Sequence, residues 1–200
     1  MGKILITSAG FNTVNNFVSD ENIQLFTDVS KDKKVLIIAN AAPEGSGNYV
    51  ARGNVKENFL KVGAQQADII DLESNNCAQI LNYDVIYVLG GDVGRLITLN
   101  SESNFSDCLR QFLDNGGTYI GESAGSIVLA EDVSYIYDIK KGTKPKYDVQ
   151  LPSYKGLGLT QLRIYPHYQK TDGAMRAKID AYEAKTGETI TRMNDGDIIS

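Results

Sequence analysis

Ser123 is the residue around which this sequence could build chemistry. It stands in Gly121-Glu122-Ser123-Ala124-Gly125, which fits the G-x-S-x-G nucleophile elbow, with an apolar run before it and a helical pattern after it. A turn this tight strains the central residue, and side chains on the flanking glycines would collide with the adjoining strand and helix. The hydroxyl is thereby held beside the free N–H groups of a new helix, where an oxyanion can be stabilised. The same pattern also fits a serine that only caps a helix.

A serine hydroxyl is a poor nucleophile near neutral pH and needs a positioned base, usually a histidine that a carboxylate orients. The chain contains one histidine, so a Ser-His pair would have to use His167. This residue follows Pro166 at the end of an apolar segment, where a rigid approach could fix the ring. We therefore expect His167 to meet Ser123, against the alternative of a histidine without a functional role.

The orienting carboxylate is less defined, because four candidates lie between the serine and the histidine: Glu131, Asp132, Asp138 and Asp148. Glu131 and Asp132 end the elbow helix and fit ordinary surface charges. Asp138 closes an alternating segment, Val133–Ile139, which we predict as a strand and which is a better place for a fixed partner. The order Ser, Asp, His would also match α/β-hydrolases.

A second glycine-rich turn, Gly90-Gly91-Asp92, follows the apolar run Val85–Leu89. It is weak as a phosphate cradle, because the chain has neither G-x-G-x-x-G nor a Walker lysine there. As a tight turn at a strand end whose N–H groups face Ser123, it fits the second half of an oxyanion hole.

Short apolar runs alternate with helical patterns from the start of the chain as far as Ala130. The predicted strands are Lys3–Ser8, Lys34–Ala39, Asp68–Leu72, Val85–Leu89 and Thr118–Gly121. This alternation predicts an α/β fold of three layers, with an open, mostly parallel sheet and helices on both faces. The active site of such a sheet lies at the carboxyl ends of its strands. Both the glycine turn and Ser123 are placed there.

The pattern changes after Ala130. We predict a strand, a loop-like insert, another strand and a helix, in the order Val133–Ile139, Lys140–Gly158, Leu159–Tyr165 and Thr171–Lys185. A turn signal at residues 194–197 precedes an apolar pair, which predicts a last strand cut short at Ser200. Because there is no linker and no internal repeat, residues 1–200 are predicted to form one domain.

Composition and charge limit the classes of molecule that the protein is expected to bind. The net charge of 20 − 25 = −5 argues against nucleic acid or an anionic membrane as the main partner. No apolar run approaches the roughly 18 residues of a membrane span, and the first run is too short for a signal-peptide core. Cys77 and Cys108 stand alone, which predicts two free thiols in a reducing cytoplasm. We expect a cytoplasmic protein without a metal or organic cofactor; its oligomeric state is not indicated.

Three motifs in this order resemble the peptidase E family. They are Gly-Gly-Asp after a strand (in place of the family's usual Gly-Gly-Asn), Gly-x-Ser-Ala-Gly some way further along the chain, and then Pro-His. The resemblance covers roughly residues 34–168. That family comprises the aspartyl dipeptidases and their cyanophycinase relatives, and the resemblance implies a flavodoxin-like fold similar to class I glutamine amidotransferases.

The resemblance also implies an activity, a serine peptidase that removes an N-terminal residue such as aspartate from short peptides through an acyl-enzyme. Ser123 would be the nucleophile and His167 the general base. Asp138 would orient the base, since it follows the serine at the same spacing as the family's aspartate does. The backbone N–H groups of Gly91 and Ala124 would form the oxyanion hole.

Departures from the family pattern concern the substrate. Asp92 replaces the usual asparagine and Glu122 occupies the variable position of the elbow, so both carboxylates are expected at the site, where they would repel an aspartyl substrate or bind its amino group. Arg176 only approximately matches the arginine with which family dipeptidases hold the aspartate. One alternative is a catalytically inactive or altered-substrate binding member of the same fold. An α/β-hydrolase-type esterase is disfavoured, because such folds normally need more chain after the elbow than the segment from Gly125 to Ser200.

Overall fold

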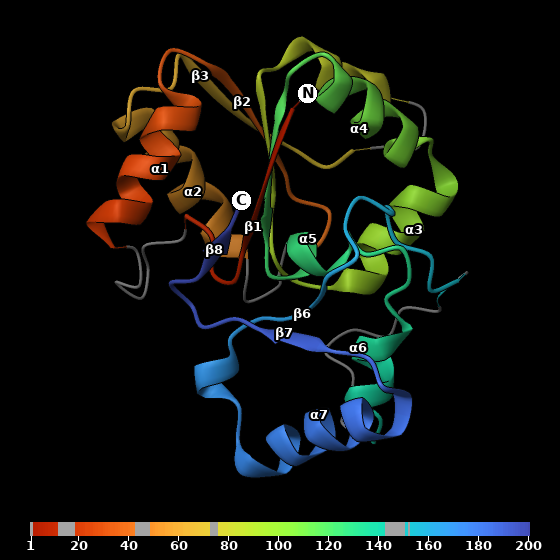
Figure 1. The fold of residues 1–200 in the computed structure, drawn as a ribbon. Coiled ribbons are helices and arrows are strands. Elements are labelled where there is room, and N and C mark those ends of the chain that lie inside the picture. The colour runs from red at the N-terminus through yellow and green to blue at the C-terminus, as the bar shows by residue number, and fades with distance from the viewer. Residues whose placement is uncertain (1, 12–18, 43–48, 73–75, 143–150, 152) are drawn as a thin grey trace.

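A computed structural model gives the fold and describes residues 2–11, 19–42, 49–72, 76–142, 151 and 153–200 (Figure 1). Its main sheet has six strands in the order β3-β2-β4-β5-β1-β8. They span Lys3–Thr7 (β1), Lys34–Ile38 (β2), Gln66–Ile70 (β3), Val85–Val88 (β4), Thr118–Glu122 (β5) and Ile198–Ile199 (β8). The first five strands are parallel, and β8 pairs antiparallel with β1. The five strands predicted before Ala130 are confirmed.

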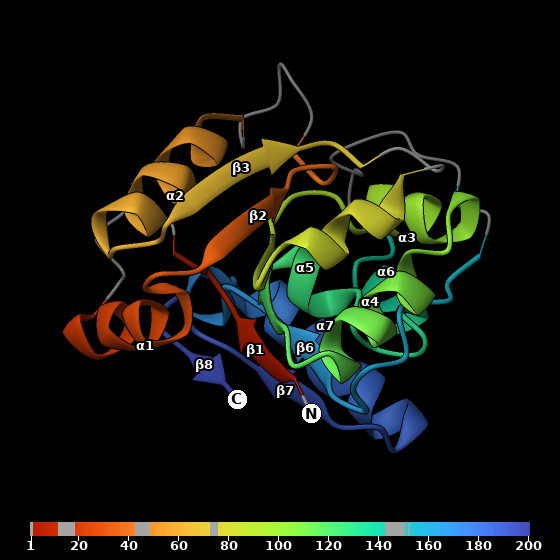
Figure 2. The same cartoon turned by 90° about the horizontal axis from the view of Figure 1, so that it is seen from above.

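Helices cover both faces of this sheet, as the view from above makes plain (Figure 2). One face carries α1 (Asp20–Ser30) and α2 (Tyr49–Lys61). The other carries α3 (Val93–Glu102), α4 (Phe105–Asp114) and the short α5 (Ala124–Ile127). A 3-10 helix, η2 (Cys77–Asn82), precedes β4.

Two separate cores follow from the alternation of side chains along each strand. In β2, Leu36 and Ile38 join the core under α3, α4 and α5, whereas Val35 and Ile37 join the core under α1 and α2. All four are fully buried, which is the burial expected of a parallel sheet covered on both faces. The strands are thus fixed from both sides, and their carboxyl ends form a rigid edge.

The two cysteines differ from expectation. Cys77 of η2 and Cys108 of α4 form a disulfide, with their Cα atoms 6.4 Å apart. The prediction of two free thiols is therefore wrong. Sequence spacing could not reveal the pair, because the two cysteines are far apart in the chain and only the packing of η2 against α4 brings them together.

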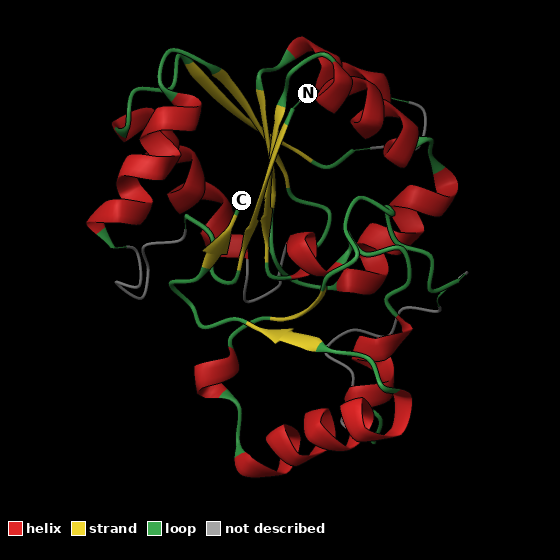
Figure 3. Ribbon diagram, in the orientation of Figure 1, coloured by secondary structure: helices red, strands yellow, loops and turns green. Residues whose placement is uncertain are grey.

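Apart from β8, the described chain after Ala130 forms a smaller layer below the main sheet (Figure 3). Its elements are α6 (Ser134–Ile139), β6 (Arg163–Tyr165), η3 (Tyr168–Lys170), α7 (Gly173–Thr186) and β7 (Ile190–Arg192). The helix and the strand predicted over 171–185 and 159–165 are confirmed, the strand in shorter form. The insert predicted over 140–158 lies in part outside the described residues, at positions 143–150 and 152.

The strand predicted over Val133–Ile139 is wrong, because this segment is the helix α6. Tyr135, Ile136 and Ile139 are buried at helical spacing, and α6 packs against α7. The sequence looked like a strand because Tyr137 completes an alternation of apolar residues. In the structure Tyr137 is only half-buried and contacts the ring of Tyr154.

Strands β6 and β7 pair in parallel, with Tyr165 opposite Arg192. Parallel pairing brings the segments that follow two strands to the same end, just as in the main sheet. The residues after Tyr165 and those after Arg192 are therefore neighbours. None of the described helices has the length and apolar composition needed to cross a bilayer.

Candidate active site

Ser123 lies between the end of β5 and the start of α5, with φ 49° and ψ −103°. A residue other than glycine rarely has a positive φ, so this backbone is strained, as a nucleophile elbow requires. Glycines make the turn possible, because a Cβ on Gly121 would lie 2.6 Å from the carbonyl oxygen of Gly125. A Cβ on Gly125 would lie 2.3 Å from the carbonyl oxygen of Val88.

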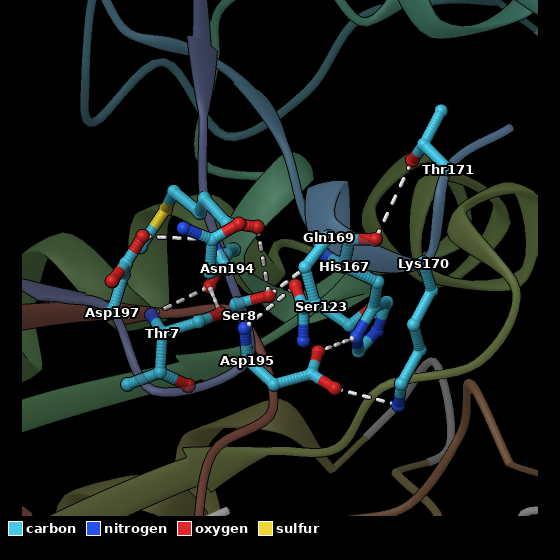
Figure 4. A network of polar contacts seen from close by, with 12 residues as sticks. Thr7, Ser8, Ser123, His167, Gln169, Lys170, Thr171, Asn194, Asp195 and Asp197 are labelled. Atoms are coloured by element: carbon cyan, nitrogen blue, oxygen red, sulfur yellow. Dashed lines mark hydrogen bonds and ion pairs between the residues drawn. The ribbon is translucent and has the colours of Figure 1, made fainter. Parts of the chain in front are cut away.

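His167 meets Ser123 as expected, with its Nε2 3.1 Å from the serine Oγ (Figure 4). The histidine follows β6 and has a left-handed backbone with φ 59°. Its N–H donates to Ser8 Oγ at 2.8 Å, so the end of β1 holds the residue that the smaller layer supplies. The two residues predicted to pair are brought together by elements 44 positions apart in the chain.

The carboxylate at the other ring nitrogen is Asp195, which bonds His167 Nδ1. An ionised carboxylate only accepts, so Nδ1 carries the proton and Nε2 is left to accept from the serine hydroxyl. Asp195 stands in the turn after β7, and the parallel pairing of β6 with β7 places this turn beside His167. Its side chain is only 1% exposed.

Asp138, the predicted orienting acid, is elsewhere. It is exposed on α6, where its charge acts on Tyr182 of α7. The prediction of Asp138 as the orienting acid is wrong. It assumed an acid between Ser123 and His167 in the sequence, whereas Asp195, which bonds the imidazole ring, follows both residues. Glu131 and Asp132 are exposed as well, and Asp148 lies outside the described residues. Asp195 belongs to the turn at residues 194–197, which the sequence marks as a turn without marking it as part of the site.

Two further groups hold Asp195. Lys170 Nζ lies 2.5 Å from Asp195 Oδ2, and Gln169 Oε1 accepts from the Asp195 N–H at 3.0 Å. Burial acts to raise the pKa of Asp195, but the contacts with Lys170 and His167 outweigh it and lower that pKa below its ordinary value. Asp195 is therefore a carboxylate across the physiological range. Lys170 had no signal in the sequence beyond its nearness to His167.

A cavity of about 340 Å³ opens beside these residues, and Gly91, Ser123, Ala124 and His167 line it. Gly91 has φ 145°, and a Cβ there would lie 1.9 Å from the carbonyl oxygen of Ala41. No described residue accepts a hydrogen bond from the backbone N–H of Gly91 or Ala124. Both N–H groups are therefore available to a ligand in the cavity; their role as an oxyanion hole stays a prediction.

The rest of the cavity wall mixes basic and apolar groups. Lys140 and Lys170 supply the basic side chains and Asp172 the acidic one. The apolar part consists of Val93, Ile127, Tyr165, Pro166 and Met175. Within the described residues, no three His, Cys, Asp or Glu side chains form a cluster that could hold a metal.

The three residues predicted to contact substrate do not line this cavity. Asp92 caps α3 by accepting from the Arg95 N–H at 3.0 Å. Arg176 lies over the ring of Tyr168 at 4.9 Å and donates to a backbone carbonyl. The Asp92 side chain is partly exposed and that of Arg176 is exposed, so their contact with substrate stays a prediction. For Glu122 the expectation is wrong, because its side chain is buried.

Glu122 instead points into the core. Its side chain accepts from the Tyr87 hydroxyl at 2.6 Å and from the N–H of Gly90, and the residue is 8% exposed. Burial raises the pKa of Glu122 to about 7, although both hydrogen bonds oppose the shift. The carboxyl group thus connects the residue before Ser123 with the glycine turn that contributes Gly91.

Comparisons with known proteins identify the family of this chain. The profile of "Peptidase family S51" matches residues 4–200. A protein named Peptidase E from Nostoc sp. is 30% identical over 139 residues, which cover 70% of this chain and 54% of the Nostoc protein. This chain thus spans about half the length of that relative. An uncharacterised peptidase of Listeria innocua is 28% identical over 151 residues, covering 73% of this chain and 71% of that protein.

A solved structure shows the same fold as this chain. A Listeria monocytogenes structure assigned provisionally to peptidase E superposes with a TM-score of 0.76 over all of this chain and 93% of its own, at 23% identity. This likeness confirms the predicted α/β fold of the class I glutamine amidotransferase-like type. Together with the profile match over nearly the whole sequence, the comparisons confirm the resemblance to peptidase E: the chain belongs to peptidase family S51.

Proposed function

We propose that this protein is a serine peptidase that removes the N-terminal residue from short peptides. The observation that carries the proposal is the continuous line of contacts from Ser123 Oγ through His167 to the buried Asp195. A hydroxyl hydrogen-bonded to an imidazole, which is itself hydrogen-bonded to a carboxylate, is the arrangement that makes serine nucleophilic.

The mechanism follows from these positions. Ser123 Oγ attacks the scissile carbonyl while His167 Nε2 takes its proton, and Asp195 stabilises the imidazolium that forms. The N–H groups of Gly91 and Ala124 stabilise the oxyanion of the tetrahedral intermediate. His167 then protonates the leaving amine, which leaves an acyl-enzyme, and water hydrolyses that ester with the same residue as base.

The size and charge of the cavity support a small, acidic substrate. About 340 Å³ is at the lower end of the range of small-molecule sites, so a dipeptide fits better than a folded protein chain. Lys140 would attract the side-chain carboxylate of an N-terminal aspartate, and Asp172 would attract the free amino group. The cytoplasmic location stays a prediction from the sequence, and the Cys77–Cys108 disulfide removes the part of it that rested on free thiols.

The test is hydrolysis of Asp-Leu, Glu-Leu, Ala-Leu and Leu-Asp by the wild type, by Ser123→Ala and by the matched control Ser101→Ala, an exposed serine of α3. We expect cleavage of Asp-Leu by the wild type and the control, and none by Ser123→Ala. Cleavage of Ala-Leu at a similar rate would keep the peptidase and remove the aspartyl preference. A folded wild type that cleaves no member would overturn the proposal and favour the binding-protein alternative; an ester substrate added to the panel tests the esterase.

A further inference from the structure

Lys170 makes a contact that a Ser-His-Asp arrangement does not require. Its Nζ lies 2.5 Å from Oδ2 of Asp195, the carboxylate oxygen that His167 does not bond. No hydrogen bond from a described residue otherwise reaches this buried oxygen. Burying a carboxylate oxygen without a partner costs free energy, so the contact with the Lys170 ammonium group stabilises the buried Asp195.

The backbone explains how one short segment reaches Asp195 from three directions. His167 has a left-handed conformation and is followed at once by the 3-10 helix η3, which ends at Lys170. His167 contacts Oδ1, Gln169 accepts from the Asp195 N–H, and Lys170 contacts Oδ2 (Figure 4). The segment that contains His167 therefore also binds Asp195, the residue that orients the His167 ring.

We propose that Lys170 is a positioning residue of the peptidase: it holds the Asp195 carboxylate in place beside His167 and moderates how strongly that carboxylate favours the imidazolium. Two cations share one carboxylate, so each weakens the attraction of Asp195 for the other. Removal of the lysine charge leaves the full negative charge to the ring. His167 then keeps its proton to higher pH and becomes available as a base only in more alkaline solution.

Other charges around this group are few. Lys140, which follows α6, and Asp172, which precedes α7, line the same cavity. Asp197, on the same turn as Asp195, accepts from the Asn194 N–H at 2.7 Å. Among the described residues, Lys170 is the cation that contacts the Asp195 carboxylate, and His167 becomes a second one only when it is protonated.

A different role for Lys170 is also testable. Its side chain is 50% exposed and lines the cavity, so it could instead bind a carboxylate of the substrate. A substrate-binding lysine would affect KM for acidic peptides alone. A positioning lysine affects the titration of His167 without any substrate, and it affects neutral and acidic peptides alike.

The first experiment uses the fact that the chain has a single histidine, so in a tag-free protein the imidazole signals in NMR all come from His167. The midpoint of its titration is measured in the wild type, Lys170→Met, Lys170→Gln and Lys170→Arg. Lys185→Met, at an exposed position of α7, removes the same charge away from the site. We expect the midpoint to rise by about one pH unit in Lys170→Met and Lys170→Gln, and to stay near the wild-type value in the other two variants. An unchanged midpoint in both neutral variants, with native NMR spectra, would overturn the proposal.

The second experiment rests on the proposed function and is separable from the first. For both Asp-Leu and Ala-Leu, kcat/KM of Lys170→Met at pH 6 should fall about tenfold below the wild type, with a smaller loss at pH 9. An increase in KM confined to Asp-Leu would instead make Lys170 a substrate-binding residue and refute its positioning role. If the wild type cleaves no peptide, the proposed function fails, while the NMR titration still decides the role of Lys170.

Discussion

The two layers of this molecule contribute to the site in different ways. The main sheet supplies Ser123 and Gly91, whose positions follow from strand ends packed between two cores. The smaller layer supplies His167 and Asp195 from strands of only three residues each. In the first layer, backbone strain and close glycine packing set the geometry. In the second, hydrogen bonds and ion pairs do so.

Ser8 joins the two layers. It follows β1, and its Oγ accepts from the His167 N–H while donating to the Met193 carbonyl at 3.3 Å. Its own N–H donates to the Asp197 carbonyl at 3.3 Å. The rigid edge of the main sheet thus positions Ser123 without help from the smaller layer, whereas His167 and the segment before Asp195 are held in place by hydrogen bonds to Ser8 at that edge. Four substitutions test this contrast.

The largest effect is expected in the smaller layer, from Asp195→Asn. Lys170 would bind the amide oxygen, which turns the NH2 group toward His167 Nδ1 and favours the tautomer that cannot accept from Ser123, so kcat should fall about 10³–10⁴-fold. Asp138→Asn is the matched control, since it changes an exposed carboxylate on α6 and should leave kcat within about twofold. Steady-state kinetics on Asp-Leu measures both. Equal losses in the two variants would contradict the assignment of Asp195.

Gly91→Ala tests the main-sheet contribution. The new Cβ would lie 1.9 Å from the Ala41 carbonyl oxygen, so the turn must move and carry its N–H away from the oxyanion. We expect kcat to fall about 10²–10³-fold, the usual cost of one lost oxyanion donor. Gly116 also has a positive φ, 88°, but a Cβ added there would have no atom within 4 Å, so Gly116→Ala is the matched control. It should lower stability by about 1–2 kcal/mol and leave kcat unchanged; a similar loss of kcat there would refute the local explanation.

Glu122→Gln tests the buried carboxyl group behind the elbow. Its folded-state pKa of about 7 exceeds the ordinary 4.5, so the folded protein holds a proton that the unfolded chain has lost. This group therefore lowers wild-type stability progressively as pH rises from about 4.5 to about 7, by up to about 3 kcal/mol at roughly 1.4 kcal/mol per pKa unit. Urea unfolding of both proteins should show the variant gaining relative stability over that range. A difference that does not change with pH would exclude the shift.

The smallest effect is expected from Arg192→Ala, which cuts the polar link between β7 and α7. Arg192 is 28% exposed in its side chain and contacts Glu183 and Asp180 at 2.7 Å each. The hydrogen bond from Arg192 is the main cause that lowers the pKa of Glu183. A loss of about 1–2 kcal/mol by urea unfolding is expected, against less than about 0.5 kcal/mol for Asp180→Asn, whose side chain is 68% exposed. Equal losses would mean that the more exposed contact, not the one to Glu183, stabilises this layer.

Sequence reasoning recovered the main sheet because each strand there is a short apolar run between helical patterns. It also recovered the Ser123–His167 pair, since the glycine pattern and the single histidine are both visible in one dimension. The strand predicted for α6 was wrong because so short a segment can satisfy period 2 while its buried face has helical spacing.

The orienting acid could not be chosen from the sequence, because its position depends on the parallel pairing of two very short strands. Such short strands carry little periodicity. The expectation that Glu122 contacts substrate was wrong for a related reason. Its side chain lies on the face of β5 that points toward Tyr87, and the local sequence does not indicate which face of the strand end borders the cavity. Contacts that join distant segments decided both cases.

Ser8 has a consequence for the order in which the protein gains activity during its synthesis. The contact between Ser8 and Met193 spans 185 positions, and closing so large a loop is among the slower steps of folding. A nascent chain that has emerged as far as α5 holds the five parallel strands and the elbow, yet it contains neither His167 nor Asp195. On the proposed mechanism, the serine hydroxyl would stay unactivated on the ribosome and would gain its base only when the last strands have docked onto the first.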